Sequence, residues 1–347
     1  MSGTDGFHLD VSDGHRLWVQ PWGDPAGIPV VFLHGGPGSG CNRSQTALFD
    51  AARHRVIFVD QRGAGQSLPH GERRNNSTAH LIADLESIRI HLGIDRWLVV
   101  GGSWGATLAL AYAQAHPDRI RGLVLRATFL GTRAELDWAF GTGLAMFHPA
   151  LHDALYALVP GADDPLTALW DLILHPDPTL HAPAAWAWYH TERALSELLP
   201  AVTQLPKMTD HTPLPATPFM EAHYFRHDCF LTDGVLMSGA ARLAGIPGII
   251  VQARYDLLCP PLTATRLAAR WPQAKLVVVE AAGHTIGHAG VQTAVRNGIM
   301  ALSQADVTHL TRQSGKGPDA RQGPPRALPA LPEPPADHPA SPQPEPR

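Results

Sequence analysis

The sequence has few cysteines, no long basic run and no long apolar stretch, and each shortage excludes a class of protein. Three cysteines (Cys41, Cys229 and Cys259) are too few and too scattered for a disulfide framework or a zinc site. A net charge of −4 without a basic run argues against a dedicated nucleic-acid binder. No run approaches about 18 apolar residues, and the first residues lack an apolar signal core. We therefore expect a soluble, cytoplasmic protein with no membrane or nucleic-acid partner; its oligomeric state stays open.

The composition permits a large folded core, except at the C-terminal end. Hydrophobic residues make up 44% of the 347 residues and charged residues 17%, which excludes wholesale disorder. From Pro318 to Arg347 proline recurs every few residues, and the large aliphatic side chains are Leu328 and Leu331. Such a segment cannot bury enough apolar surface to offset the entropy of ordering. We predict a disordered, passive tail over 313–347, with a polyproline-type ligand as the alternative.

Short apolar runs alternate with helical patterns along most of the remaining chain. Six runs are continuously apolar: 30–33, 56–59, 98–100, 123–125, 249–251 and 276–279. Continuous runs are typical of strands covered on both faces of a parallel sheet. Helical patterns occur at 81–88, 106–115 and 261–269. This alternation predicts an α/β fold with a mostly parallel, doubly wound sheet.

The middle of the chain breaks this alternation. Between residues 131 and 239 no convincing strand run occurs, and Trp, Leu and Ala recur at helical spacings between prolines. We predict an inserted helical cap over 131–239 and a catalytic domain made of residues 1–130 and 240–312. Ligands of open α/β sheets bind at the carboxyl ends of the strands. An insertion at that end would cover the site as a lid.

The sharpest chemical signal is Gly-Gly-Ser-Trp-Gly at 101–105, between an apolar run and a helical pattern. It fits G-x-S-x-G in the strand–turn–helix context that a nucleophilic serine requires. The outer glycines allow a tight turn from which Ser103 projects, and the first amides of the following helix point to the same place. We interpret Ser103 as a nucleophile; a purely structural turn is the alternative.

A serine nucleophile needs a base, and the base needs an acid that orients it. With this motif the expected order along the chain is serine, then Asp or Glu, then His. Asp256 and His284 occur in that order, each just after an apolar run. Side chains at the ends of different strands can converge, so we predict a triad of Ser103, Asp256 and His284. Taken singly, Asp256 could be a turn or cap residue and His284 a surface residue.

Two glycine-containing turns also follow apolar runs. His-Gly-Gly-Pro-Gly at 34–38 can aim a backbone N–H at a developing oxyanion, with the amide of Trp104 as the second donor. A phosphate-binding loop is disfavoured, because G-x-x-x-x-G-K-[ST] is absent from the sequence. We interpret the polar turn at 60–67 as structural, with Arg62 able to brace neighbouring loops.

Histidine is abundant, with 20 residues, but its spacing does not favour a metal site. His284 and His288 are four apart, yet Gly283 and Gly287 disfavour a helix that could present both as ligands, and H-E-x-x-H is absent from the sequence. We predict neither a metal nor another cofactor.

Four segments taken together resemble a known family. HGGPGSG, DQRGAGQS, GGSWGATLALAYAQAHPD and ARYDLLCP, in this order, are similar to proline iminopeptidase (prolyl aminopeptidase), a serine peptidase family of the α/β-hydrolase fold. The resemblance runs from about residue 30 to residue 288 and leaves out the proline-rich tail. It implies release of N-terminal proline from peptide substrates, without a metal.

The resemblance also implies which residues bind the substrate. The segments 187–192 and 221–225 place Glu192 and Glu221 on the two glutamates with which the family recognises the protonated imino terminus. The other substrate-binding residues that it implies, the last three of them around the proline ring, are Arg126, Phe129, Phe225 and Cys259.

Two positions depart from the pattern of the family. Thr191 stands where the family usually has Trp, and Ala139 stands where an aromatic side chain usually lines the ring pocket. A smaller side chain at position 139 predicts a wider pocket or a repacked Phe140. We therefore expect relaxed selectivity, with ring-substituted proline or N-terminal alanine also accepted.

These residues lead to the hypothesis of a serine aminopeptidase. Ser103 attacks the carbonyl of the N-terminal residue, His284 moves the proton, Asp256 orients His284, and the amides of Gly36 and Trp104 bind the oxyanion. An esterase or other small-molecule hydrolase is the first alternative, because it needs the triad and not the glutamates. A catalytically silent binding homologue is the second, and the intact motifs argue against it.

Overall fold

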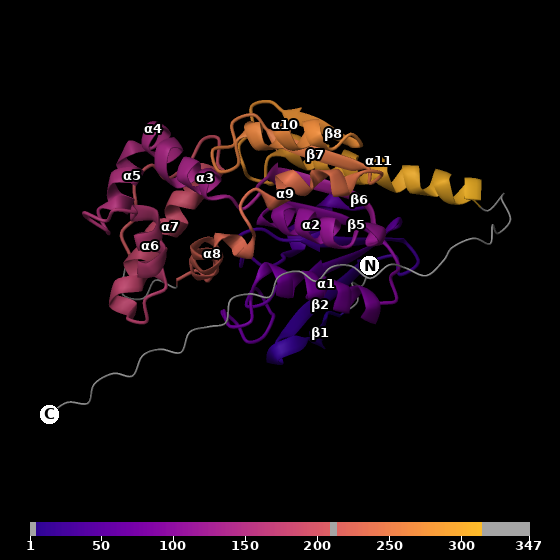
Figure 1. Ribbon diagram of the computed structural model, residues 1–347, viewed down its shortest axis with the longest axis horizontal. Helices are drawn as coiled ribbons and strands as arrows, with labels where there is room; N and C mark the ends of the chain where they lie inside the picture. The colour runs from indigo at the N-terminus through magenta and orange to yellow at the C-terminus, as the bar shows by residue number, and fades with distance from the viewer. Residues whose placement is uncertain (1–4, 209–213, 314–347) are drawn as a thin grey trace. The chain divides into compact units, whose positions relative to one another are not determined.

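Residues 5–208 and 214–313 are described by a computed structural model (Figure 1). The sheet and its helices as far as Thr308 form one unit, Met1–Thr308. The tail predicted over 313–347 lies outside the described residues, apart from its first position. None of the helices within these ranges has the length and apolarity needed to cross a membrane.

Eight strands form a single sheet in the described part of the chain, in the order β1-β2-β4-β3-β5-β6-β7-β8. From β4 to β8 neighbouring strands pair in parallel, whereas β1 and β2 pair antiparallel at one edge. The strands are β1 Phe7–Asp10, β2 Arg16–Gly23, β3 Ile28–Leu33, β4 His54–Val59, β5 Trp97–Ser103, β6 Ile120–Thr128, β7 Gly248–Ala253 and β8 Ala274–Val279. The predicted α/β class with a mostly parallel sheet is confirmed.

The six apolar runs of the sequence all lie in strands, β3 to β8, and each strand extends beyond its run. Sequence reasoning missed β1 and β2. In β2, buried side chains such as Leu17 and Val19 alternate with less buried ones, and the strand contains Pro21. It therefore lacks the continuous apolar run that marks a strand covered on both faces.

Helices cover both faces of the sheet. Alternate residues of a strand point to opposite faces, so a strand can contribute to two apolar clusters. In β3, Val31 and Leu33 belong to one apolar cluster, and Val30 and Phe32 belong to another. The first cluster includes side chains of α1 (Thr78–His91), α2 (Trp104–Ala115) and α10 (Pro261–Arg270), and the second includes those of α11 (Ala289–Gln313). The helices predicted between the apolar runs are confirmed.

Helices and turns, without a strand, occupy the described residues between 131 and 239. The helices are α3 Arg133–Leu136, a π-helical segment Asp137–Thr142, α4 Gly143–Phe147, α5 Pro149–Tyr156, α6 Pro165–Ile173, α7 Pro178–Ser196, α8 Thr217–Arg226 and α9 Val235–Ser238. Figure 1 shows α4 to α7 grouped at one side of the sheet. Side chains of this region, such as Trp170 and Trp188, share an apolar cluster with α2. Because the core is continuous, the division into catalytic domain and cap stays a prediction.

Three of the prolines that interrupt the sequence pattern in this region mark the starts of helices. Pro149, Pro165 and Pro178 each open a helix. The first helical position has no intrahelical use for an N–H, and the fixed φ of proline suits it. The same prolines therefore divide the region into short helices rather than disrupting it.

The strand order reverses at β3, since β4 lies on one side of it and β5 on the other. In open α/β sheets, ligands bind in the crevice outside the carboxyl ends of the strands at such a point. The glycine-rich loop at 34–38 follows β3, and Ser103 ends β5. The fold thus brings two of the predicted site elements to one crevice.

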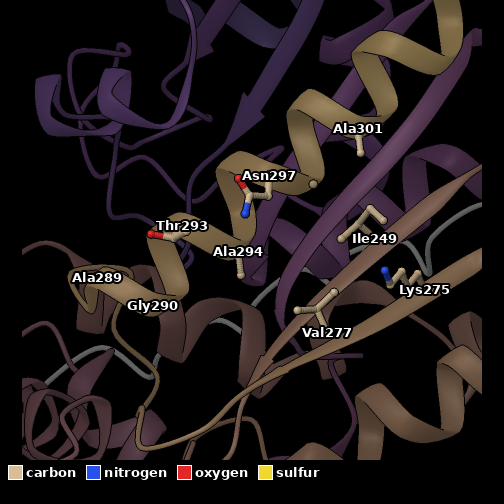
Figure 2. A pocket seen from close by; sticks show the side chains of 10 residues that line it. Ile249, Lys275, Val277, Ala289, Gly290, Thr293, Ala294, Asn297 and Ala301 are labelled. Atoms are coloured by element: carbon tan, nitrogen blue, oxygen red, sulfur yellow. The ribbon is translucent and has the colours of Figure 1, made fainter.

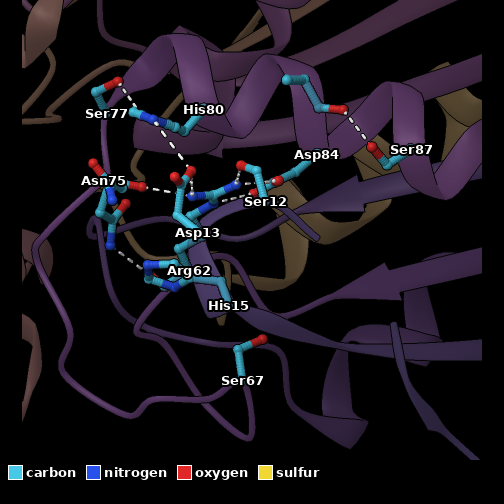
Figure 3. A network of polar contacts seen from close by, with 12 residues as sticks. Ser12, Asp13, His15, Arg62, Ser67, Asn75, Ser77, His80, Asp84 and Ser87 are labelled. Atoms are coloured by element: carbon cyan, nitrogen blue, oxygen red, sulfur yellow. Dashed lines mark hydrogen bonds and ion pairs between the residues drawn. The ribbon is translucent and has the colours of Figure 1, made fainter. Parts of the chain in front are cut away.

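A buried ion pair holds the polar turn that follows β4. The Arg62 side chain is fully buried, and its guanidinium donates to both carboxylate oxygens of Asp84 on α1, at 2.7 and 2.8 Å (Figure 3). It also donates to the Asn75 carbonyl at 2.6 Å and the Ser12 hydroxyl at 2.8 Å. Burial raises the pKa of Asp84, and the hydrogen bonds and charge of Arg62 oppose that rise. Arg62 therefore joins the β1–β2 turn to α1 and to the loop before it.

Replacing Arg62 by Met should destabilise the fold by about 3–5 kcal/mol, because the Asp84 carboxylate is then buried without its partner. Urea unfolding at pH 7 measures this loss. Arg226→Met is the matched control, since Arg226 and Asp171 form an exposed pair whose loss costs at most about 1 kcal/mol. Equal losses in the two variants would contradict the role assigned to Arg62.

Candidate active site

Ser103 stands in a strained turn between β5 and α2. Its backbone has φ 57° and ψ −125°, a region that residues other than glycine rarely adopt. A Cβ at Gly105 would lie 2.2 Å from the carbonyl oxygen of Leu33 in β3, and a Cβ at Gly101 would lie 2.2 Å from that of Gly105. Both outer positions of the motif therefore require glycine. The close packing places Ser103 at the crevice with the N-terminus of α2 directly behind it.

Asp256 and His284 meet at the ends of neighbouring strands. Asp256 follows β7, His284 follows β8, and both side chains are buried. His284 Nδ1 lies 3.0 and 2.9 Å from the two carboxylate oxygens of Asp256. The backbone N–H groups of Leu258 and Cys259 also donate to Asp256 Oδ1, at 3.1 and 2.8 Å. The carboxylate is thus fixed by its own loop and can hold one ring nitrogen of His284, as an orienting acid must.

One cavity collects most of the predicted residues. Its empty space, counted together with the part that is open to solvent, is about 370 Å³. Seven residues from the sequence hypothesis line it: Gly36, Ser103, Glu192, Glu221, Phe129, Phe225 and Cys259. Five further lining residues are Glu135, Leu136, Ala139, Phe140 and Leu258. The lining residues are therefore mostly apolar, with Ser103 and three glutamates as the polar ones, as is usual for a small-molecule site.

Two glutamates from the helical insertion lie together in this cavity. Glu221 on α8 is 1% exposed, and its Oε2 accepts a hydrogen bond from the indole of Trp188 at 2.7 Å. Its carboxyl is hydrogen-bonded to that of Glu192 on α7. Burial, and then the charge of Glu192, raise the pKa of Glu221 well above its ordinary value. Burial also raises the pKa of Glu192, which the charge of His284 opposes. A hydrogen bond between two carboxyls requires a proton on one of them, and the raised pKa values of both favour that proton.

The aromatic wall of the cavity is organised by Trp188 on α7. Phe140 stacks on Trp188 with ring centroids 4.0 Å apart and planes at 20°. Phe129 and Phe225 form an edge-to-face pair at 6.0 Å. Ala139 and Phe140 both line the space, so a small side chain and an aromatic one stand side by side there. Thr191 is buried on α7 and does not belong to the lining.

Arg126 contacts the loop of His284, and its predicted role in substrate binding stays a prediction. It is half-buried, it is not among the lining residues, and its Nη1 donates a hydrogen bond to the carbonyl oxygen of His284. The cause is strand register: Arg126 on β6 pairs with Gly102 on β5, where a Cβ would lie 2.6 Å from the guanidinium. The side chain therefore runs across the strand end to the loop of His284. Its contacts brace that loop rather than form part of the cavity wall.

Glu135 is a cavity residue that sequence reasoning missed. It closes a capping box at the start of α3, where it accepts hydrogen bonds from the backbone and hydroxyl of Thr132 at 3.1 and 2.8 Å. It also accepts from the Leu130 amide and from the hydroxyl of Thr263 at 3.1 Å. Burial raises the pKa of Glu135, and these hydrogen bonds oppose the rise. Thr-x-x-Glu before a helix is the sequence signal that could have found it.

One group of three potential metal ligands occurs among the described residues. Side-chain atoms of Asp256, Cys259 and His284 lie within 4.8 Å of one another. The carboxylate already accepts from two loop amides and pairs with the imidazole, and burial raises the pKa of the Cys259 thiol well above its ordinary value. These contacts account for the cluster as an acid–base pair beside a thiol. The absence of a metal stays a prediction.

A second hollow lies between α11 and the strands β7 and β8 (Figure 2). Its wall is mainly aliphatic and small, with Lys275, Thr293 and Asn297 as its polar members. None of the predicted site residues lines it. The chemistry indicated by the sequence therefore belongs to the cavity at Ser103.

Comparison with known proteins defines the class first. A family model described as alpha/beta hydrolase fold matches residues 28–290, so the chain is an α/β hydrolase. The solved structure of proline iminopeptidase from Mycobacterium smegmatis aligns with a TM-score of 0.59 and 20% identity, over 87% of this chain and 100% of that one. At this identity the likeness supports the fold alone.

Within this class the chain belongs to the proline iminopeptidase family. A probable proline iminopeptidase of Leptolyngbya boryana is 41% identical over 290 residues, which cover 83% of this chain and 90% of the relative. The proline iminopeptidase of Xylella fastidiosa (strain 9a5c) is 42% identical over 282 residues, which cover 80% and 90%. The resemblance drawn from the four sequence segments is confirmed.

Glu221→Gln should raise the melting temperature at pH 8. Because the pKa of Glu221 is raised in the fold, the folded chain keeps a proton that the unfolded chain loses above about pH 4.3. Stability therefore falls as the pH rises from that value through the raised pKa. Gln cannot ionise and still accepts from Trp188, so the advantage of the variant should grow from pH 4 to pH 8 in differential scanning calorimetry.

Glu197→Gln serves as the control for this measurement, because the Glu197 side chain at the end of α7 is 38% exposed. Its melting temperature should follow that of the unmodified protein across the same pH range. A Glu221→Gln variant that is less stable at pH 8 than at pH 4, relative to the unmodified protein, would contradict the raised pKa.

Proposed function

We propose that this protein is a serine aminopeptidase that releases N-terminal proline from peptides through an acyl-enzyme. The observation that carries the proposal is the pair of carboxyls of Glu221, which is buried, and Glu192, which is half-buried, in the same cavity as Ser103. The names of the relatives support the same activity. A hydrolase of neutral esters has no use for two neighbouring acids that destabilise one another.

The substrate binds by its cationic end. A protonated imino terminus displaces the proton held between Glu192 and Glu221 and forms charge-assisted hydrogen bonds to both carboxylates. The pyrrolidine ring packs among Phe129, Phe225 and Phe140, apolar surfaces that suit its methylene groups. The stacked Phe140 and Trp188 close the space behind the ring, so no residue can precede the proline.

Ser103 then attacks the carbonyl carbon of the bound residue. His284 takes the hydroxyl proton as the bond forms and returns it to the leaving amine, while Asp256 holds the imidazole and stabilises its cation. The amides of Gly36 and Trp104 hold the oxyanion. Water, deprotonated by His284, hydrolyses the acyl-enzyme and restores the serine.

The partners of this reaction are peptides with a free N-terminal proline. The small side chain of Ala139 in the cavity lining, where the family usually has an aromatic one, supports acceptance of substituted proline and of alanine. Cys41, Cys229 and Cys259 are free thiols, in keeping with the cytoplasmic location proposed from the sequence.

Ser103→Ala should abolish turnover of prolyl-β-naphthylamide, because the nucleophile is then absent. Loss of a triad member leaves about 10³–10⁴-fold catalysis over water in the best-studied serine peptidases, so kcat should fall by several orders of magnitude. Release of naphthylamine measures it, and labelling by a fluorophosphonate should disappear in parallel. Undiminished turnover or labelling would overturn the assignment.

Glu192→Gln should raise KM for prolyl amides by at least about tenfold while changing hydrolysis of p-nitrophenyl acetate by less than about twofold. The substrate cation loses a charged partner, and the neutral ester never used it. In the unmodified enzyme the KM for the amide should also rise as the pH falls, because the raised pKa of Glu192 lets the pair regain its proton. Equal effects on amide and ester would favour an esterase.

A further inference from the structure

The side chain of Gln61 lies between the two elements that supply the proposed oxyanion amides. Gln61 is buried in the turn after β4. Its Nε2 donates a hydrogen bond to the carbonyl oxygen of His34 at 3.0 Å, two residues before Gly36. Its Oε1 accepts one from the indole nitrogen of Trp104 at 2.8 Å. A single amide therefore spans from the glycine-rich loop to the residue that follows the nucleophile.

Two further contacts of His34 hold the glycine-rich loop in place at this point. The backbone N–H of Gln61 donates to His34 Nε2 at 3.0 Å, and His34 Nδ1 lies 2.9 Å from the carbonyl oxygen of Gly35. Burial lowers the pKa of His34, which favours the neutral ring that this pattern requires, with Nε2 as acceptor and Nδ1–H as donor. The carbonyls of His34 and Gly35 are thus both held just before the Gly36 amide.

The other side of Trp104 is held by the helical insertion. Its ring packs edge-on against Tyr224 of α8, with centroids 4.7 Å apart. The Tyr224 hydroxyl donates to Asn76 Oδ1 at 2.7 Å, and Asn76 Nδ2 donates to the carbonyl oxygen of Arg62 at 3.0 Å. Arg62 follows Gln61, so the contacts form a closed ring. The same helix α8 carries Glu221 and Phe225 into the cavity.

We propose that Gln61 is a positioning residue that sets the separation and direction of the two oxyanion amides; the proposal rests on acyl transfer at Ser103. Only a side chain with one donor and one acceptor at this length satisfies both neighbours. An oxyanion stabilises the transition state only when its donors lie at hydrogen-bond distance from the developing charge. A shift of either element therefore lowers kcat and leaves ground-state binding in the cavity unchanged.

Gln61→Leu tests this by removing both side-chain hydrogen bonds. Removal of a whole oxyanion donor costs about 10²–10³ in kcat. Misplacing the donors should cost about 10–100-fold, for prolyl-β-naphthylamide and for p-nitrophenyl acetate alike, with KM within about twofold. Affinity for prolylboronic acid, whose tetrahedral adduct with Ser103 directs an oxygen at the same amides, should weaken by a similar factor.

Gln114→Leu is the matched control. Gln114 is also a buried glutamine, and its Nε2 donates to a backbone carbonyl, that of Leu236, at 2.8 Å. It lies ten residues further along α2, about 15 Å from Trp104 at the rise of an α-helix. This variant should lose stability as Gln61→Leu does and keep kcat and boronate affinity within about twofold. Equal kcat losses in the two variants would overturn the proposal.

Gln61→Glu keeps the test decisive if Gln61→Leu does not fold. Its ionised carboxylate can accept from Trp104 but repels the His34 carbonyl, whereas its protonated form provides donor and acceptor again. Its kcat relative to the unmodified enzyme should therefore rise as the pH falls from 8 to 5.5. A ratio that does not change with pH would overturn the proposal.

The ester and the boronate separate this proposal from the proposed function. Failure of the unmodified enzyme to release proline, with ester hydrolysis intact, would refute the peptidase and leave the Gln61 comparison measurable on the ester. Normal proline release with an unchanged kcat in Gln61→Leu would refute only the role of Gln61.

Discussion

Helix α2 packs so closely on β3 that the carbonyl oxygen of Leu33 occupies the space where Gly105 would carry a Cβ. This contact forces the chain to turn sharply out of β5, and the turn leaves Ser103 in a backbone conformation that costs about 1–3 kcal/mol. The sheet, the helix and the apolar clusters around them supply the stability that holds it there. Because the turn is anchored to β3, the loop after β3 lies beside it, and the two proposed oxyanion amides come from adjacent structures.

Packing in the insertion also offsets an unfavourable feature, here two acidic side chains rather than a strained backbone. Glu192 and Glu221 lose free energy through burial and mutual repulsion, and the helices that carry them recover it through apolar packing around Trp170 and Trp188. In the proposed function, a cationic substrate end replaces the proton that the two carboxyls share, whereas a neutral end leaves that proton in place.

Sequence reasoning recovered the parts of this molecule that are local in the chain. Continuous apolar runs identified β3 to β8. The G-x-S-x-G turn and the order of Asp256 and His284 predicted a triad, of which the structure describes the contact between His284 and Asp256. Sequence reasoning missed β2, whose alternation does not mark a buried strand, and it did not predict the contact of Arg126 with the loop of His284. The register between β5 and β6 decides where Arg126 points. The sequence of one strand alone does not reveal how it pairs with its neighbour.

For the residues around the site, too, contacts between distant parts of the chain could not be predicted from the local sequence. The turn at 60–67 was recognised as a motif, but the two hydrogen bonds of Gln61 depend on partners 27 and 43 residues away. Glu192 and Glu221 look like ordinary helix glutamates by spacing, and the family resemblance alone singled them out. Glu135 had a local signal in its capping box, yet nothing in that signal indicates that the residue also lines a cavity.

Trp188 links two properties that could otherwise change independently. Its ring face stacks on Phe140, and its indole nitrogen donates to Glu221. Any substitution there changes both the stacking surface of Phe140 and the hydrogen bond of Glu221. A change in the proposed side-chain preference that leaves the Glu221 contact intact therefore has to come from neighbours such as Ala139.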